Sequence, residues 1–471
     1  MPAPIKSLLT SWSVALSAAA FLSAGAASHA QSSQSASDSE RIRRLEEAVG
    51  QLQRENRELR AEATHESIKA DQQRSGMPPW VTSFKFNGDM RGRFEQNNAG
   101  NSAYVDRNRY RYRLRFGATA TMLDDFEVGF RLTSGDPATG GVGGTMLFGG
   151  NPDSANTTLG SGSSRKFIWV DKAYGKWTPI HSDDWTFSGT FGKMDNPFAL
   201  SNMIFDHDLQ PEGAALQGAY RINEAHALKV NGGLFVLNEI PGSSRDPYLA
   251  GAQVLWEGRW TPKLETAVGM AVFKVSGKDQ LLPSQAPNVE AGNTRDATGR
   301  LLNSFNPIVG NASVTYKLDS LPLYQGEFPV KLGGEFMKNP GASSNNEGWN
   351  AGITFGKAAK RGNWEVFYRY QVLRADAWYE EFPDDDNGAF YATGHPLLTG
   401  ASNANGLQGA GFLGGTNIRG HYFKATYSFT DFATLSLSYY LNELIINNSA
   451  SATTDKRDGA GHLIVDMMWK F

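Results

Sequence analysis

Four arginines alternate with aromatic and apolar residues in the stretch RYRYRLRF, residues 109–116. Successive side chains of a β-strand point to opposite faces, so Arg109, Arg111, Arg113 and Arg115 share one face. The guanidinium group is permanently charged, and its planar fork matches carboxylate and phosphate. This spacing predicts a row that passes an anion from site to site, provided that each arginine binds it weakly enough to release it.

Arg91 and Arg93 alternate in the same way within residues 84–95, which extends the predicted basic wall to six arginines. Like charges at alternate positions of one strand lie about 6–7 Å apart and repel one another. Acidic partners are therefore expected. The alternative interpretation is that the arginines pair with carboxylates of neighbouring strands and only hold the wall, the candidates being Asp89, Glu95 and Glu127.

Two acidic segments are candidates for ion binding. Asp206-His207-Asp208 suits either a cation contact or, as we favour, a polar loop. The run DDDNG at 384–388 resembles the start of a calcium loop but lacks the remaining ligands at the required spacing, which favours an acidic surface loop. The chain has no cysteine, so disulfides and thiolate metal sites are excluded. We predict no metal and no cofactor.

The composition limits the class of protein. The 471 residues carry a formal net charge of −3, which gives no support for a nucleic-acid partner. Glycine (51 residues) and aromatic residues (11%) are plentiful, as expected for many strands joined by tight turns. After the first thirty residues, no apolar run is long enough for a membrane-spanning helix. If this chain crosses a membrane, strands must carry it.

Residues 1–30 are typical of a secretory signal peptide. Lys6 gives a positive start, residues 8–22 are mostly apolar, and Ser28 and Ala30 are the small residues expected before cleavage. A membrane anchor is the disfavoured alternative, because the apolar run is short and broken by serines. We expect export and removal of this segment near Ala30, followed by a Ser/Gln-rich linker over 31–39.

A heptad pattern covers residues 40–74. Its apolar seam includes Leu45, Val49 and Leu52 at spacings of three and four, with Asn56 as a polar register-fixing position. The pattern predicts a short coiled coil that reinforces an oligomer, and it does not choose between a dimer and a trimer. A solvated single helix is the alternative. Pro78 and Pro79 end the segment.

From residue 80 onward, alternating segments of about 8–13 residues are joined by short turns and long loops in turn. Sixteen such strands, with both chain ends on the short-turn side, predict an all-β transmembrane fold. The expected architecture is a 16-stranded antiparallel outer-membrane β-barrel over 80–471, preceded by the coiled-coil helix. The predicted strands are 84–95, 109–122, 126–133, 166–178, 185–194, 214–221, 227–237, 248–260, 264–275, 307–317, 330–338, 349–357, 363–374, 419–429, 432–443 and 462–471.

Three motifs carry a resemblance to a known family. FNGDMRGRFE (86–95) and RNRYRYRLRFGA (107–118) resemble the putative-porin family of Gram-negative outer membranes, a relative in style of the phosphate-selective porins. The ending LIVDMMWKF resembles the signal read by the barrel-assembly machinery. The resemblance implies a passive channel for small hydrophilic solutes in the cell outer membrane. It also implies a homotrimer in contact with lipid and lipopolysaccharide, and we expect peptidoglycan as a further partner through 40–74.

The resemblance also implies that the third long loop, 195–213, folds into the channel. Its acidic residues would then form the constriction opposite the basic wall, and they are Asp195, Asp206, Asp208 and Glu212. An acidic loop facing arginines would set a transverse field across a narrow aqueous pore and give it a lean toward anions.

Two other functions remain open at this point. A lipase or protease barrel would need a serine and a histidine side by side, and the strand pattern juxtaposes no such pair, so we predict no enzyme. A structural barrel that binds the cell wall through 40–74 is the main alternative to a channel.

Overall fold

The computed structural model describes residues 49, 51, 78–100, 105–140, 146–282, 286, 291–296, 298–391, 411–446 and 459–471. Val49 and Gln51 are helical. The predicted signal peptide, linker and the rest of the coiled-coil segment lie outside the described residues. Pro78–Phe471 forms one compact unit. In the described part of the chain, no helix has the length and apolar character needed to span a bilayer.

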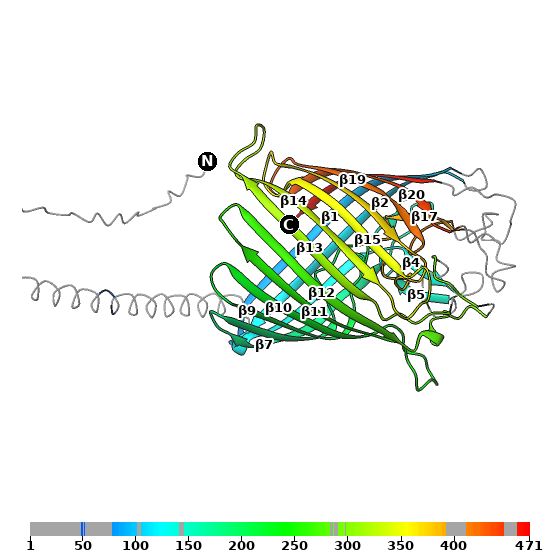
Figure 1. The fold of residues 1–471 in the computed structure, drawn as a ribbon, viewed down its shortest axis with the longest axis horizontal. Helices are drawn as coiled ribbons and strands as arrows, with labels where there is room; N and C mark the ends of the chain where they lie inside the picture. The colour runs from blue at the N-terminus through cyan, green and yellow to red at the C-terminus, as the bar shows by residue number, and fades with distance from the viewer. Residues whose placement is uncertain are drawn as a thin grey trace, which may run out of the picture. The chain divides into compact units, whose positions relative to one another are not determined.

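Sixteen long strands form a closed antiparallel barrel, as the alternation predicts (Figure 1). Each strand pairs with the next long strand along the chain, and β1 closes the ring on β21, from Asp89 opposite Lys470 to Ala99 opposite Ala460. The long strands are β1 (Val81–Ala99), β2 (Arg107–Met122), β3 (Phe126–Ser134), β7 (Ile168–His181), β8 (Trp185–Lys193), β9 (Glu212–Arg221), β10 (His226–Val236), β11 (Tyr248–Arg259), β12 (Leu264–Ser276), β13 (Ile308–Leu318), β14 (Phe328–Lys338), β15 (Glu347–Gly356), β16 (Trp364–Leu373), β19 (Ile418–Ser428), β20 (Ala433–Leu444) and β21 (Ala460–Lys470).

The predicted strands match these bounds closely, with β1 as the exception. It extends to Ala99, beyond the predicted end at Glu95. The added residues Gln96, Asn97 and Asn98 are polar and lie outside the predicted strand, but in the barrel they pair with β21. Hydrogen bonding to both β2 and β21 therefore extends β1 through polar residues whose types alone do not predict a strand.

Several short elements lie in segments that the sequence pattern assigns to loops. They are β4 (Pro137–Gly140), β5 (Met146–Gly150), β6 (Thr157–Thr158), β17 (Gly388–Tyr391), β18 (Gly411–Gly414) and the 3-10 turns η1 (Leu123–Asp125) and η3 (Lys278–Gln280). The β6 strand pairs with Arg111 and Tyr112 of β2, beyond the reach of β3. The second long loop therefore returns to the barrel wall beside the arginines.

The two faces of β2 differ as the alternation predicts. Tyr110 on the outer face is 64% exposed, whereas Arg113 on the lumen face is 4% exposed. The lumen face is covered because long loops fold inward. Figure 1 shows the short elements β4, β5 and β17 at the long-loop end of the barrel.

Candidate functional site inside the barrel

The loop 194–211, between β8 and β9, crosses the interior of the barrel. Its Ala199 backbone N–H donates to Gln253 Oε1 of β11 over 2.9 Å. At its far end, Asp208 meets Arg113 of β2 at 3.2 Å. β2 and β11 lie six strands apart around the sixteen-strand ring, so the loop spans the lumen.

A second segment, 374–387, also folds inward after β16. Its Trp378 indole N–H donates to the Ile204 carbonyl of the first loop over 2.7 Å, and the Asp206 N–H donates to the Phe382 carbonyl over 2.7 Å. The sequence pattern assigned this segment to one long loop, 375–417, without an inward fold. The signal for burial was its run of large aromatics, Trp378, Tyr379 and Phe382, which is costly on a solvated surface.

An apolar cluster joins both segments to the wall of β10–β16. Phe205 is its centre: the ring centroids lie 5.4 Å from Phe273 of β12, 5.6 Å from Trp378 and 5.5 Å from Phe382. Phe198 packs edge-on against Phe273 at 4.9 Å. Edge-to-face and tilted pairs of this kind add about 0.5–1.5 kcal/mol each beyond their buried area.

The opposite wall, on β1, β2 and β21, is charged. Arg93 is its most connected member. The Nε and Nη2 atoms of Arg93 donate to the two oxygens of Asp466 over 2.8 and 2.9 Å. Its Nη1 donates to Asp386 of the second segment over 2.7 Å. One guanidinium therefore binds both the neighbouring strand and an inward segment.

Glu95 pairs with two arginines of the next strand. It forms an ion pair with Arg109 and another with Arg111 at 3.3 Å. Arg111 also donates to the Asn156 carbonyl over 3.1 Å, and Arg91 donates to the Asn156 side chain over 2.6 Å. The loop after β3 is fixed to the arginine wall by these contacts.

Arg113 and Arg115 share two carboxylates. Asp89 of β1 lies 2.9 Å from Arg113 and 2.8 Å from Arg115. Asp208 of the loop 194–211 lies 3.2 Å from both. Of the three carboxylates that the sequence named as wall partners, Asp89 and Glu95 fill that role, whereas Glu127 accepts from the Tyr174 hydroxyl over 2.8 Å.

The six wall arginines meet six carboxylates within ion-pair distance, so their charges balance. The carboxylates are Asp89, Glu95, Asp136, Asp208, Asp386 and Asp466. This geometry favours the interpretation in which the arginines stabilise the barrel wall through ion pairs. It does not favour the alternative, in which unpaired guanidinium groups line a path for anions.

Two of the predicted constriction residues lie away from this contact. Asp195 pairs with Lys172 of β7 at 2.7 Å and keeps a side chain that is 66% exposed. Glu212 is the first residue of β9, and it pairs with Lys193 at 2.9 Å. They mark the two ends of the loop where it leaves the wall, while Asp206 and Asp208 lie deep in the lumen.

Asp206 lies in a buried acidic cluster with Asp384 and Asp385 of the second segment. The Asp385 N–H donates to Asp206 Oδ2 over 3.1 Å, and the Asn202 amide donates to Asp384. Burial and the neighbouring carboxylates raise the pKa of Asp206 well above its ordinary value and that of Asp384 to about 7. These carboxyls therefore hold protons near neutral pH.

Asp386 behaves in the opposite way. Burial would raise the pKa of its carboxyl, but the charges of Arg93 and His462 outweigh burial and hold the pKa well below its usual range. For Asp208 burial acts in the same upward direction, and Arg113 leads the cations that lower its pKa. The carboxyls of Asp208 and Asp386, which bind arginine, stay ionised, whereas those of Asp206 and Asp384 keep their protons to a higher pH.

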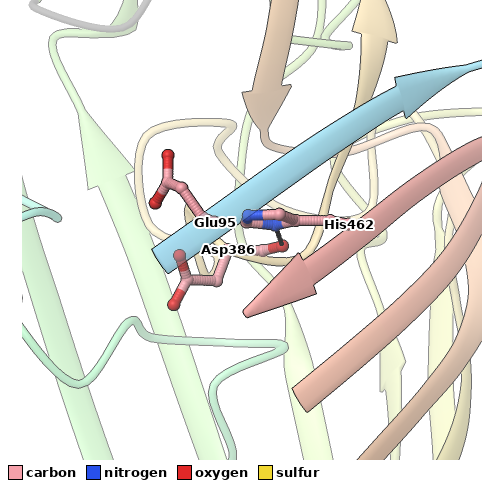
Figure 2. Close-up of side chains that lie close together, drawn as sticks. All are labelled: Glu95, Asp386 and His462. Carbon is pink, nitrogen blue, oxygen red and sulfur yellow. Dashed lines mark hydrogen bonds between the residues drawn. The ribbon is translucent and has the colours of Figure 1, made fainter. Parts of the chain in front are cut away.

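A second group of metal-ligand types lies at the arginine wall. Figure 2 shows Glu95 of β1, Asp386 of the inward segment and His462 of β21 side by side. The His462 Nδ1–H donates to the Asp386 carbonyl over 2.8 Å. However, Glu95 and Asp386 already bind Arg93, Arg109 and Arg111, so a further cation would meet excess positive charge. This donor set does not fit a metal.

A cavity of about 780 Å³ lies beside the loop 194–211. Its lining combines the wall of β3 and β7–β11 with both inward segments, and it includes Trp169, Lys193, Asp208, Phe235 and Phe382. Polar groups and aromatic faces therefore line the same space beside the crossing loop.

Residues 100–295 match the model of the family described as "Putative porin". The match confirms the resemblance over that part of the chain, which includes the ladder Arg109–Arg115, β3 and the crossing loop. Among curated proteins, none matches the chain.

Solved porins resemble the chain at low sequence identity. The high-pH structure of OprB from Pseudomonas putida is 13% identical, with a TM-score of 0.47, and the alignment covers 82% of this chain and 94% of that one. A five-substitution variant of the Rhodopseudomonas blastica porin is 10% identical with a TM-score of 0.40, covering 83% of this chain and 100% of that one.

Proposed function

We propose that this chain is a passive diffusion channel for small hydrophilic solutes in the outer membrane of a Gram-negative bacterium. The observation that carries the proposal is the loop 194–211, which crosses the lumen from β8 and is tied to β2 through Asp208. A crossing loop inside a closed barrel leaves a narrow passage, here beside the 780 Å³ cavity. Such a passage selects solutes by size and charge without an energy source.

In this proposal the arginine wall holds the constriction in place. Its six guanidinium groups bind carboxylates from β1, β21 and three inward loops. Buried charges persist only when they are paired, so this network fixes where each loop sits. Selectivity for anions would then depend on cationic side chains in the lumen that have no carboxylate partner.

The outer face supports the proposed location. Outward aromatic side chains such as Phe86 and Phe191, both more than 70% exposed, suit contact with lipid rather than water. We propose contact with outer-membrane lipid and lipopolysaccharide, association into a homotrimer, and removal of the signal peptide. A tethering role for 40–74 stays a prediction, because that segment lies outside the described residues.

Planar-bilayer recording tests the channel proposal. The purified, folded chain is expected to insert in discrete steps of ohmic conductance in potassium chloride. Asp208→Asn, which removes the loop's ion pairs to Arg113 and Arg115, is expected to raise the conductance of each step. Lys172→Gln, which removes an ion pair at the loop's rim, is the matched control. Folded protein that inserts without conducting would overturn the proposal.

A further inference from the structure

Arg369 of β16 is buried without a carboxylate. It is one of five arginines that the fold buries among the described residues, and it is 4% exposed. The other four are Arg91, Arg93, Arg111 and Arg113, and each has an ion pair. The Nε and Nη2 atoms of Arg369 have no hydrogen-bond partner in the part of the chain that the structure describes. A buried guanidinium of this kind carries a desolvation cost that no described side chain offsets by ion pairing.

Two aromatic rings flank the guanidinium group of Arg369. Its guanidinium carbon lies 5.8 Å from the ring centre of Phe367 and 5.6 Å from that of Tyr422. Cation–π contacts of this type stabilise the charge without a hydrogen bond. They use none of its N–H bonds, so the N–H groups at Nε and Nη2 still lack an acceptor among the described residues.

Lys424 of β19 adds a second positive charge on the same lumen face. Arg369 lies opposite Tyr422, and Lys424 follows two residues later, so the two cations are diagonal neighbours. Diagonal Cβ atoms across two strands lie about 7–8 Å apart, within reach of long side chains. Within the described residues, Lys424 forms no ion pair, and neither does Glu365, the lumen-facing carboxylate four positions before Arg369.

His207 of the crossing loop lies close enough for the charges of both cations to act on its ring. Burial lowers the pKa of its ring, and the charges of Lys424 and Arg369 lower it further, although Asp208 acts in the opposite direction. The ring is therefore neutral at neutral pH. Asp384 is close enough to Arg369 for the cation to act on its charge, but it accepts no hydrogen bond from it. Arg369 of β16, Lys424 of β19 and the neutral ring of His207 are therefore near one another, and neither cation has an ion pair among the described residues.

We infer that Arg369 and Lys424 form an exchangeable binding station for a small oxyanion, a carboxylate or a phosphate, inside the lumen. The inference rests on the proposed channel function and names where its charge selectivity arises. The planar fork of Arg369 matches two oxygens of one oxyanion, and the ammonium of Lys424 adds charge without a fixed geometry. Because no carboxylate of the described residues occupies these donors, the missing counter-ion is one that arrives from solution and leaves again.

Block of the chloride current by inorganic phosphate tests the station in planar bilayers. We expect phosphate to reduce the wild-type current in a saturable way. Arg369→Gln should raise the half-blocking concentration roughly tenfold or more, because the charged fork is lost. Arg369→Lys keeps the charge without the fork and should fall between the two. The same titration with acetate shows which oxyanion binds more tightly.

Two further variants keep the test decisive. Lys424→Gln should raise the half-blocking concentration roughly threefold, and it decides the question if Arg369→Gln fails to fold. Arg419→Gln removes an arginine from the outer face of β19, where Glu443 pairs with it at 2.5 Å, and should leave the block unchanged. An unblocked wild-type current, or block that both lumen variants leave intact, overturns the station.

The station can also be tested without conductance. Phosphate that exchanges on and off the folded barrel in detergent should show a broadened ³¹P resonance, and Arg369→Gln should restore the narrow line. If no variant conducts, the channel proposal fails, whereas the line width still reports on the station. A narrow line with the wild-type barrel contradicts it.

Discussion

The two sides of the lumen hold the inward loops by different physics. On β1, β2 and β21, the loops meet charged side chains: Asp208 binds Arg113 and Arg115, and Asp386 binds Arg93. On β10–β16 they meet apolar ones, with Phe205 at the centre of an aromatic cluster. Ion pairs specify position through geometry and partner identity, whereas apolar packing contributes through buried area and shape.

This difference decides what each contact contributes to the barrel. The charged contacts also join neighbouring strands, since Arg93 of β1 binds Asp466 of β21 at the seam where the ring closes. The aromatic cluster joins loops to the wall, and it adds little to the pairing of one strand with another. Loss of a charged contact should therefore weaken the barrel itself, and loss of an aromatic contact should mainly release a loop.

Arg93→Ala should have the largest effect. The substitution leaves Asp466 and Asp386 without the guanidinium that binds both, and breaking a buried pair in this way costs about 3–5 kcal/mol. We expect the folded band on unboiled gels to be lost at a clearly lower temperature than for the wild type. A melting temperature equal to that of the wild type would mean that the seam does not depend on this arginine.

Phe205→Ala should act on the other side of the lumen. Truncation of a buried phenylalanine costs about 3–5 kcal/mol, and here the affected contacts join the loop 194–211 to Phe273 and Trp378. We expect a small change in the melting temperature of the barrel, a larger conductance, and chymotrypsin cleavage within the loop. A drop in melting temperature as large as that of Arg93→Ala would break the comparison.

The sequence predicted the barrel wall better than the segments inside the lumen. The strands of the wall follow from a local pattern, whereas the inward segments depend on contacts between residues far apart in the chain. Alternation is local, and it placed the strands and the lumen face of Arg109–Arg115 correctly. The partners of those arginines come from far along the chain: Asp386 is 293 residues from Arg93, and Asp208 is 95 residues from Arg113. Nothing in the local pattern distinguishes a free guanidinium from a paired one.

The interior fold of 374–387 was missed for a related reason. Its acidic run DDDNG suggested a surface loop, and the aromatic residues just before it carried the opposite signal. Trp378 and Phe382 are buried in the lumen, and Asp384 and Asn387 of the acidic run are buried with them. Likewise, the predicted strand 363–374 contains Arg369, but its lack of an ion-pair partner is visible only once the fold brings neighbouring strands together.

The acidic contact between the two inward segments should respond to pH. The pKa of Asp384 is raised from 3.8 to about 7, so the folded state binds the proton more tightly than the unfolded chain. Its stabilising effect is complete below about pH 4 and is lost as the pH rises through about 7. We expect conductance to increase over this range as Asp206, Asp384 and Asp385 gain charge and repel one another.

Asp384→Asn tests the assignment, because an amide does not titrate and should flatten the pH profile of conductance. Asp195→Asn changes an exposed carboxylate of the loop rim and is the control that should keep the wild-type profile. If conductance still depends steeply on pH in Asp384→Asn, another group causes the pH response, and the acidic contact between the two inward segments does not control conductance.

The exposed ion pair between Lys172 and Asp195 should have the smallest effect. It lies where the crossing loop leaves β8, at 2.7 Å, with an Asp195 side chain that is 66% exposed. Exposed pairs contribute about 0–1 kcal/mol and are screened by salt, so Lys172→Ala should shift the melting temperature little and less still at high ionic strength. A shift comparable to that of Arg93→Ala would show that the rim, rather than the buried arginine wall, limits stability. The difference in melting temperature between Lys172→Ala and Arg93→Ala therefore measures how far burial and the number of partners, rather than charge alone, determine what an ion pair contributes to stability.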